Sequence, residues 1–269
     1  MSDKGFLWFC QNNDNTDYVE LSIALAESIK KHNKVNKVCV ITDSKTKITS
    51  PHIDVVRVLD HDDSQGHELK WANEWQAFNL TPFTHTIKLA ADMLWTSNTD
   101  WWWYYLWRHD MVFAVDCYNY RDILVKDVKY RPHHKRNLLP NVYSDLTYFR
   151  KSQRAFFFSK VCKVITQNWQ EVCESILVNC FDKYPSTDVV YALANRIIDP
   201  TQSHSIDYPW FKILHNKKSI NALEHVADQS NYLMPTRIAN NTYLGNHAIT
   251  RPLHYVDKKT LKDMDVRNF

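Results

Sequence analysis

Single carboxylates stand at the ends of apolar runs in this 269-residue chain. Asp92 lies near the end of the run HTIKLAADMLW, Asp43 closes KVCVITD, and the polar segment QNND follows GFLWFC. A divalent cation that bridges a diphosphate takes carboxylate oxygens, at times one imidazole, and keeps positions open for the ligand. Asp92 has the chemistry for such a site. Position 90, where a second acid would complete an acid–x–acid pair, is Ala90.

The C-terminal stretch YLGNHAITRPLHY could complete the site. His247 offers an imidazole, and Arg251, four residues on, offers a partner for phosphate. A lone histidine is more often a surface or core residue than a metal ligand, and an acid at a strand end is more often a cap or turn former. The metal interpretation therefore depends on the whole set of residues rather than on any one of them.

Glycine is scarce, which limits how phosphate could be held. The chain has only three glycines: Gly5, Gly66 and Gly245. A Rossmann fingerprint or a P-loop needs two or three close together, so neither can be built here. A bound nucleotide would have to be held by a metal or by side chains. The formal net charge of +3 does not by itself demand a nucleic-acid partner.

Composition is that of an ordinary globular protein, 44% hydrophobic and 23% charged. The sequence predicts no membrane-spanning segment and no signal peptide. The six cysteines have no CxxC or zinc-finger spacing. We therefore expect reduced, mostly buried thiols and a cytoplasmic protein.

The apolar patterns predict alternating strands and helices that would position these residues. Strands are expected over 5–11, 37–43, 54–59, 85–95, 110–116 and 145–151. Helices are expected over 17–33, 68–80, 98–108, 152–169 and 187–198. Asp17 and Glu20 form a capping box for the helix over 17–33, and Asn98 or Thr99 would cap the helix over 98–108. This alternation indicates an α/β fold with a mostly parallel central sheet flanked by helices, in which ligands bind at the carboxyl ends of strands. Nothing in the chain forces a domain boundary.

The motifs, taken in order, resemble the GT-A glycosyltransferases, which have a Rossmann-like fold, and in particular their glycogenin-like branch. DNTDY is similar to the segment whose Tyr contacts the uracil ring, LKWANEW to a Leu-x-Lys-x-x-x-Trp helix, and LAADMLWTSNTDWWW to the Asp-x-Asp strand end with its Asn-x-Asp turn. NVYSDLTYF resembles the Asn-Ser-Gly-Val strand, TDVVYALA the helix that begins with an Asp over the sugar, and HAITRPLHY the closing His with its basic tail.

The resemblance implies one glycosyltransferase domain over 1–269, with a nucleotide-sugar half (1–115) and an acceptor half (116–269) that carries the C-terminal metal and diphosphate segment. It implies a UDP-sugar donor, Mn²⁺ or Mg²⁺ bound by Asp92 and His247, and retention of anomeric configuration. The resemblance also implies contacts with the nucleoside: Tyr18 would stack on the base, and Asn12, Asn13 and Asp43 would lie near the base and ribose. Lys70 would reach the sugar or phosphate, and Arg251 would bind the diphosphate. Asp188 would face the donor sugar. Asp188, Lys70 and Asp92 would be the catalytic residues.

Two positions depart from the family pattern. Ala90 replaces the first acid of the Asp-x-Asp pair, and Asp145 stands where the family has a small residue. Three explanations of Ala90 remain open: a naturally rearranged site, a constructed substrate-trapping variant, or an inactive relative that still binds a nucleotide-sugar or DNA.

Basic and aromatic residues in three stretches could bind an acceptor. Interleaved basic and aromatic groups suit a phosphate backbone and an extruded base. The compact, glycine-poor chain is similar to glycosyltransferases of large tailed phages, and some phages glycosylate hydroxymethylcytosine in their DNA. This resemblance makes double-stranded DNA bearing hydroxymethylcytosine the leading acceptor. A polysaccharide or a protein is the alternative acceptor. The candidate contacts are Lys126, Lys129, Arg131, Lys135, Arg136, Arg150, Lys151 and Trp101. A solvated basic loop and a core tryptophan cluster would explain the same residues.

Overall fold

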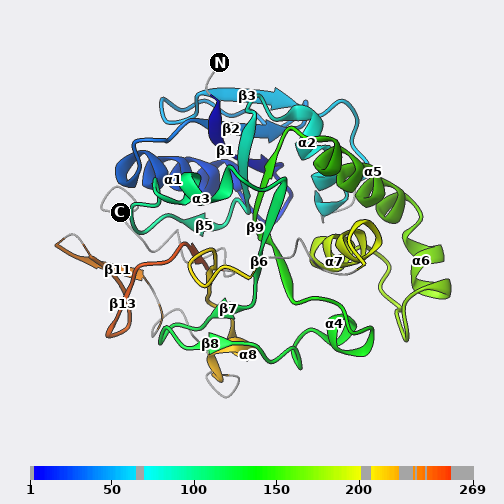
Figure 1. The fold of residues 1–269 in the computed structure, drawn as a ribbon. Coiled ribbons are helices and arrows are strands. Elements are labelled where there is room, and N and C mark those ends of the chain that lie inside the picture. The colour runs from blue at the N-terminus through cyan, green and yellow to red at the C-terminus, as the bar shows by residue number, and fades with distance from the viewer. Residues whose placement is uncertain are drawn as a thin grey trace.

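The computed structural model describes residues 3–64, 70–200, 207–223, 233, 235–239 and 241–255. It has a mixed α/β fold in which a mostly parallel central sheet is flanked by helices (Figure 1). The fold class expected from the alternation of strands and helices is thereby confirmed.

The central sheet has six strands. Their order is β3 (Val55–Val58), β2 (Val38–Thr42), β1 (Lys4–Cys10), β4 (His85–Leu89), β9 (Val142–Arg150) and β6 (Met111–Val115). The first four are parallel, and β9 runs antiparallel to both β4 and β6. The carboxyl ends of β1, β2 and β4 therefore meet the beginning of β9 at one edge of the sheet.

Strand β1 lies in the middle of the sheet and is buried on both faces. Phe6 and Trp8 pack into the core on one face, and Leu7 packs into the core on the other. Gly5 is required here because the Phe83 ring fills the space of a side chain: a Cβ at Gly5 would lie 2.4 Å from a ring carbon.

Helices cover the two faces of the sheet (Figure 1). Helix α1 (Tyr18–His32) begins after Asp17, whose carboxylate accepts hydrogen bonds from the Val19 and Glu20 amides, as the sequence predicts for the cap. It shares its face of the sheet with the short helix α3 (Trp102–Leu106). The other face carries α5 (Gln153–Gln167), α6 (Trp169–Ser175) and α7 (Thr187–Ile198).

Three predicted elements differ in the structure. The helix expected over 68–80 is a 3₁₀ helix, η1 (Lys70–Gln76), followed by α2 (Ala77–Leu80), and its first two positions lie outside the described residues. The strand expected over 85–95 divides into β4 and β5 (Met93–Leu94). The helix expected from 98 begins only at α3, because Asn98 and Thr99 instead bond to the C-terminal end of α1: Asn98 donates to the His32 carbonyl, and the Thr99 amide donates to Asn33 Oδ1 at 2.8 Å.

Short strands form two further sheets that the sequence did not predict. One contains β5, β14 (Leu253–His254), β10 (Leu214–His215), β7 (Cys117–Tyr118) and β8 (Leu124–Val125), in that order. The other contains β11 (Pro235–Ile238), β12 (Asn241–Leu244) and β13 (His247–Ile249). The helices α4 (Pro132–Arg136) and α8 (Lys218–Asn221) complete the described elements. Within the described residues, no helix is long and apolar enough to cross a membrane.

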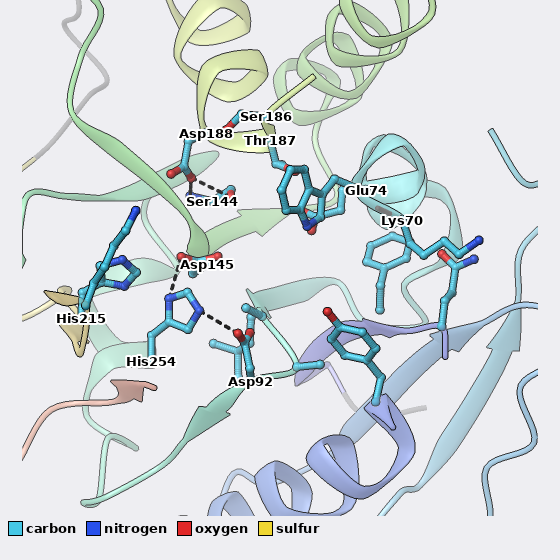
Figure 2. A pocket seen from close by; sticks show the side chains of 18 residues that line it. Lys70, Glu74, Asp92, Ser144, Asp145, Ser186, Thr187, Asp188, His215 and His254 are labelled. Atoms are coloured by element: carbon cyan, nitrogen blue, oxygen red, sulfur yellow. Dashed lines mark hydrogen bonds and ion pairs between the residues drawn. The ribbon is translucent and has the colours of Figure 1, made fainter. Parts of the chain in front are cut away.

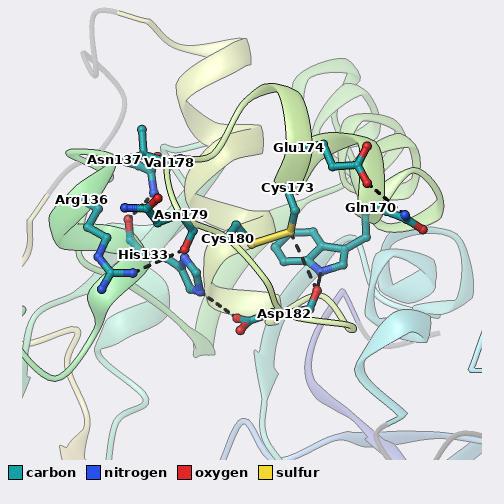
Figure 3. Close-up of a disulfide and its surroundings, with 11 residues drawn as sticks. His133, Arg136, Asn137, Gln170, Cys173, Glu174, Val178, Asn179, Cys180 and Asp182 are labelled. Carbon is teal, nitrogen blue, oxygen red and sulfur yellow. Dashed lines mark hydrogen bonds and ion pairs between the residues drawn. A yellow bond between two sulfur atoms is a disulfide. The ribbon is translucent and has the colours of Figure 1, made fainter.

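The cysteines follow the prediction only in part. Cys10, Cys39, Cys117 and Cys162 are buried free thiols, as expected. Cys173 and Cys180 instead form a disulfide beside α6 (Figure 3), so the expectation of six reduced cysteines is wrong for this pair. Both bonded residues are buried, and the nearby Trp169 Nε1 donates to the Asp182 carbonyl at 2.8 Å.

Candidate functional site

A cavity of about 430 Å³ opens where β1 and β4 end and β9 begins. Its lining comes from these strands, the η1 helix, the start of α7, and the short strands β10 and β14 (Figure 2). Four residues predicted for donor binding or catalysis line it: Tyr18, Lys70, Asp92 and Asp188. The cavity thus lies at the carboxyl edge of the parallel strands, where ligands bind in α/β sheets.

Asp92 lies just beyond the point where the chain leaves the central sheet. After β4, the Ala90 amide donates to the Asp145 carbonyl at 3.2 Å, and the Asp92 carbonyl accepts from the Tyr255 amide at 3.2 Å. The chain then continues as β5, which pairs antiparallel with β14 so that Met93 lies opposite His254. This pairing brings a C-terminal histidine to Asp92.

His254 lies between two carboxylates (Figure 2). Its Nε2 is 3.1 Å from Asp92 Oδ2, and its Nδ1 is 3.0 Å from Asp145 Oδ2. The Nδ1 contact has the distance of an ion pair without the geometry of a hydrogen bond. All three side chains are largely buried, which strengthens electrostatic interactions among them.

His215 adds a second imidazole to this cluster. Strand β10 pairs in parallel with β14 and places His215 beside His254, with the ring centroids 4.6 Å apart. Its Nδ1 is buried and has no hydrogen-bond partner. Burial, reinforced by His254 and Lys217, lowers the pKa of His215 well below its ordinary value, so the ring is neutral at physiological pH and retains a lone pair. Potential ligand atoms of Asp145, His215 and His254 lie within 4.8 Å of one another.

The histidine predicted as a metal ligand lies elsewhere. His247 is exposed on β13, with its ring 5.5 Å from that of Tyr120, and does not line the cavity. Arg251, predicted to hold the diphosphate, bonds to Asp122 at 2.7 Å and covers the Tyr118 ring. His254, seven positions beyond His247, takes the place beside Asp92.

Asp188 is held firmly at the start of α7. Its Oδ1 accepts hydrogen bonds from the Ser144 amide and hydroxyl at 2.7 and 2.8 Å, and its Oδ2 lies 2.6 Å from Arg131. Burial alone would raise the pKa of Asp188, but the Arg131 charge and the two Ser144 hydrogen bonds together hold it below its ordinary value. Asp188 is therefore a fixed negative charge at the cavity wall.

A second, more open groove adjoins the cavity. It has a volume of about 1020 Å³ and is lined by Asn12, Asn13, Asp43 and Lys70, among others. Lys70 lines both spaces, and its ammonium donates to the Ser64 hydroxyl at 3.2 Å. The predicted nucleoside-binding residues thus lie together, next to the cavity that holds Asp92.

A buried ion pair beneath the cavity was not predicted. Lys88, on β4, contacts the Glu74 carboxylate and donates to the Ser144 carbonyl at 3.1 Å. Burial raises the pKa of Glu74, and the Lys88 charge opposes that rise. A lysine inside the apolar run HTIKLAADM was a signal of such a pair. His215 closes the much shorter apolar run KILH, which is too brief to predict a strand.

The predicted acceptor residues are not one surface. Arg131 is buried against Asp188, Arg150 pairs with Asp110 at 2.8 Å, and Lys151 donates to the Phe78 carbonyl at 2.5 Å. Trp101 packs against Trp210, with the ring centroids 5.0 Å apart.

The neighbour of Trp101, Asp100, accepts from the Lys34 and Val35 amides. These amides precede β2, whereas the cavity lies at the carboxyl edge of the sheet. Trp101 therefore does not line the approach to the cavity. Four residues of the set remain exposed in the segment before and within α4: Lys126, Lys129, Lys135 and Arg136.

Comparisons of the chain with protein-family models and with curated proteins find no match.

Proposed function

We propose that this chain is a GT-A-type glycosyltransferase that takes its sugar from a UDP-sugar. The proposal is carried by one observation: a cavity at the carboxyl ends of β1 and β4 contains Asp92 and His254 in contact and adjoins a groove lined by Asn12 and Asp43. The adjacent spaces suit a nucleoside and a sugar, with a diphosphate between them.

Each part of the donor has a candidate partner. The groove would take the base and ribose, with Asn12, Asn13 and Asp43 as polar contacts and Tyr18 at the cavity side. Lys70 lines both spaces, so its ammonium is available to a diphosphate that joins them. Arg251, engaged with Asp122, has no part in this proposal.

The residues around His254 fit a divalent cation. Two imidazoles and two carboxylates converge there, and one of the imidazoles has a buried nitrogen without a partner. Such donors are those that Mn²⁺ and similar ions take in proteins. When bound, the cation would offset the negative charge that grows on the diphosphate as the sugar departs.

Asp188 has a separate task in the proposed reaction. The bond between the anomeric carbon and the diphosphate oxygen breaks, a bond to an acceptor hydroxyl oxygen forms, and the departing diphosphate oxygen takes the hydroxyl proton. The sugar carries positive charge during this exchange, and Asp188, kept ionised by Arg131 and Ser144, is a preorganised anion at the cavity wall. The resemblance to the glycogenin-like branch favours retention of configuration.

For the acceptor we propose double-stranded DNA bearing hydroxymethylcytosine. The supporting observation is the Arg131–Asp188 ion pair, which anchors the basic segment at the cavity wall. Exposed Lys126, Lys129, Lys135 and Arg136 flank that anchor in the chain and are available to phosphates. A base would have to leave the duplex to bring its hydroxymethyl group to a sugar held in this cavity.

The test combines donor binding with product analysis. UDP is titrated calorimetrically with and without Mn²⁺, and hydroxymethylated DNA is incubated with candidate UDP-sugars before its nucleosides are examined by mass spectrometry. A glycosylated hydroxymethylcytosine supports the whole proposal. UDP release without DNA modification supports a polysaccharide or protein acceptor, and binding without turnover indicates an inactive relative. Failure to bind UDP overturns the proposal.

The acceptor proposal predicts the behaviour of one double variant. Replacing Lys135 and Arg136 by Ala should weaken DNA binding and reduce the log–log salt slope by about two, because each phosphate contact contributes roughly 0.9. Fluorescence anisotropy at several salt concentrations measures this effect. UDP-sugar hydrolysis without acceptor should stay nearly unchanged.

The matched control is the Lys34→Ala, Lys160→Ala double variant, which removes the same charge from exposed positions elsewhere. Equal DNA affinity in the test variant and the parent would exclude this segment as the acceptor surface.

A further inference from the structure

We propose that Asp145, His215 and His254 are the protein ligands of a transition-metal ion. In this arrangement, Asp145 replaces the acid missing at position 90. Asp92 orients His254 and does not bind the ion. The role of this ion in catalysis rests on the proposed function, but its binding can be measured without any donor.

Asp145 is adjacent to the position where the acid is missing. Strands β4 and β9 pair up to Leu89 and Leu146, and the next backbone contact joins the Ala90 amide to the Asp145 carbonyl at 3.2 Å. Both side chains line the same cavity. A carboxylate absent from one strand is thus present on its neighbour.

The two nitrogens of His254 point in different directions, which assigns the two carboxylates different roles. Nδ1 faces Asp145 and Nε2 faces Asp92, at 3.0 and 3.1 Å. Only one nitrogen of an imidazole can bind a given ion. Asp145 faces Nδ1, and ligand atoms of Asp145, His215 and His254 all lie within 4.8 Å of one another, so the ion belongs on the Nδ1 side.

Asp92 then completes a common arrangement. A metal-bound histidine usually donates its other ring N–H to a carboxylate, which sets its orientation and increases its basicity. Asp92 Oδ2 is at hydrogen-bond distance from Nε2 and is buried, as that role requires. Asp92 is therefore a positioning residue in this arrangement.

His215 supplies an observation independent of the carboxylates. It is 8% exposed, lines the cavity, and has a buried Nδ1 without a hydrogen-bond partner. Unsatisfied buried polar atoms are rare and call for an explanation, of which an unseen ion is one.

The donor set selects the type of ion. Mg²⁺ and Ca²⁺ prefer ligands that are all oxygen, whereas imidazole favours first-row transition metals. Two imidazoles and one carboxylate leave positions open for diphosphate oxygens. We therefore expect Co²⁺ to bind more tightly than Mn²⁺, and Mg²⁺ not to displace either.

The experiment uses the full chain without donor and Mn²⁺ as the probe, with free Mn²⁺ measured by electron paramagnetic resonance. Asp145→Asn and His215→Ala should each weaken binding by more than about 100-fold, and Asp92→Asn by about 10- to 100-fold, the usual effect of losing an orienting carboxylate. His247→Ala is the matched control, since His247 is exposed and outside the cavity. Circular dichroism and melting temperatures of the metal-free variants separate loss of ligand from loss of fold.

Two measurements keep the test decisive if a variant folds poorly. Electron spin echo modulation of wild-type protein with Mn²⁺ should reveal two coupled imidazole nitrogens. The double variant Ala90→Asp, Asp145→Asn should recover binding, because it moves the acid back across the strand pair. One coupled nitrogen, or tight binding by Asp145→Asn, overturns the assignment.

Failure of this inference and failure of the proposed function give different results. If Mn²⁺ binds through these residues but UDP does not bind, the metal site stands and the glycosyltransferase proposal falls. If UDP-sugar turnover persists in Asp145→Asn and His215→Ala, the function stands and the ligand assignment falls. Absence of any transition-metal binding to the wild-type chain also overturns the assignment.

Discussion

Residue chemistry in this cavity depends on side chains that are far apart in the chain. His254 and Asp92 are separated by 162 positions, yet their side chains are 3.1 Å apart. His247 and His254 occur in one C-terminal run, and His247 was preferred because a basic residue and a proline follow it. The pairing of β5 with β14 instead brings His254 to Asp92, and no local pattern reveals which short strands pair.

Lys70 allows a direct test of how the two spaces are joined. Lys70→Ala should weaken UDP binding by about 10-fold or more, because a charged hydrogen bond contributes about 1.5–3 kcal/mol. The melting temperature should change little, since the ammonium donates one hydrogen bond to the Ser64 hydroxyl and otherwise acts on the exposed Asp62 carboxylate through its charge. Calorimetric titration of UDP checks the first effect and thermal unfolding the second.

Lys34→Ala, at an exposed lysine outside both spaces, is the control for Lys70→Ala. Wild-type UDP affinity in the Lys70 variant would place the diphosphate somewhere other than the junction of cavity and groove.

Strand-end chemistry singled out Asp92, and the resemblance to the GT-A family singled out Tyr18, Lys70 and Asp188. All four line the cavity. His215 and the role of Asp145 depend on non-local pairing, which a single sequence does not show.

At the scale of elements, long periodic segments were predicted well. Helix α7 has the expected bounds, and α1 and the central strands other than β4 differ by only a few positions. The predictions were wrong where a side chain bonds across elements. The helix expected from Asn98 is the clearest example, because the Asp100 carboxylate accepts amide hydrogen bonds from Lys34 and Val35 in the loop before β2.

Asp54 should make the connection between α1 and β2 sensitive to pH. Its carboxylate contacts Lys30, lies 2.8 Å from Lys37 Nζ, and accepts from the Val38 amide at 2.9 Å. Burial alone would raise the pKa of Asp54, but these three partners hold it below the ordinary value of 3.8. A lowered native pKa adds stability at pH values above 3.8, and that stability disappears as the pH falls through the native pKa.

We expect Asp54→Asn to lower the free energy of unfolding by about 1–2 kcal/mol at neutral pH. The difference from wild type should shrink as the pH drops below 3.8, where Asp54 itself becomes protonated. Urea unfolding over this pH range measures both effects. Asp127→Asn is the control and should change stability little, because it removes a carboxylate paired with exposed Lys129. A pH-independent loss of stability in Asp54→Asn would refute the electrostatic explanation.

At the scale of the molecule, the chain builds its cavity from both halves of the sequence. The central sheet supplies Asp145, the link from β4 to β5 supplies Asp92, and the small sheet of β5, β14 and β10 supplies His215 and His254. The sequence predicted the first sheet from long apolar runs. Strands of two residues, such as β10 and β14, carry too little pattern to be recognised, so the second sheet was not predicted.

The disulfide stabilises a region on the far side of α7 from the histidine cluster. Cys173 and Cys180 are seven positions apart. The loop between them contacts α4 and its cap: the Val178 amide donates to Asn137 Oδ1 at 2.7 Å, and Arg136 donates to the Asn179 carbonyl at 3.4 Å (Figure 3). Closing so short a loop should add about 2 kcal/mol to the free energy of unfolding, mainly by restricting the unfolded chain. Reduction, or the Cys173→Ser, Cys180→Ser variant, should therefore lower stability by that amount.

Mn²⁺ affinity should be unchanged by this loss, since neither cysteine lines the cavity. Denaturant unfolding with and without reductant measures the stability difference, and the double serine variant, which should be insensitive to reductant, is the control. Alkylation followed by mass spectrometry of the purified protein establishes whether the bond is present. If reductant destabilises wild type and the serine variant equally, the bond has no part in stability, and α6 and α7 are held by their apolar contacts with the sheet alone.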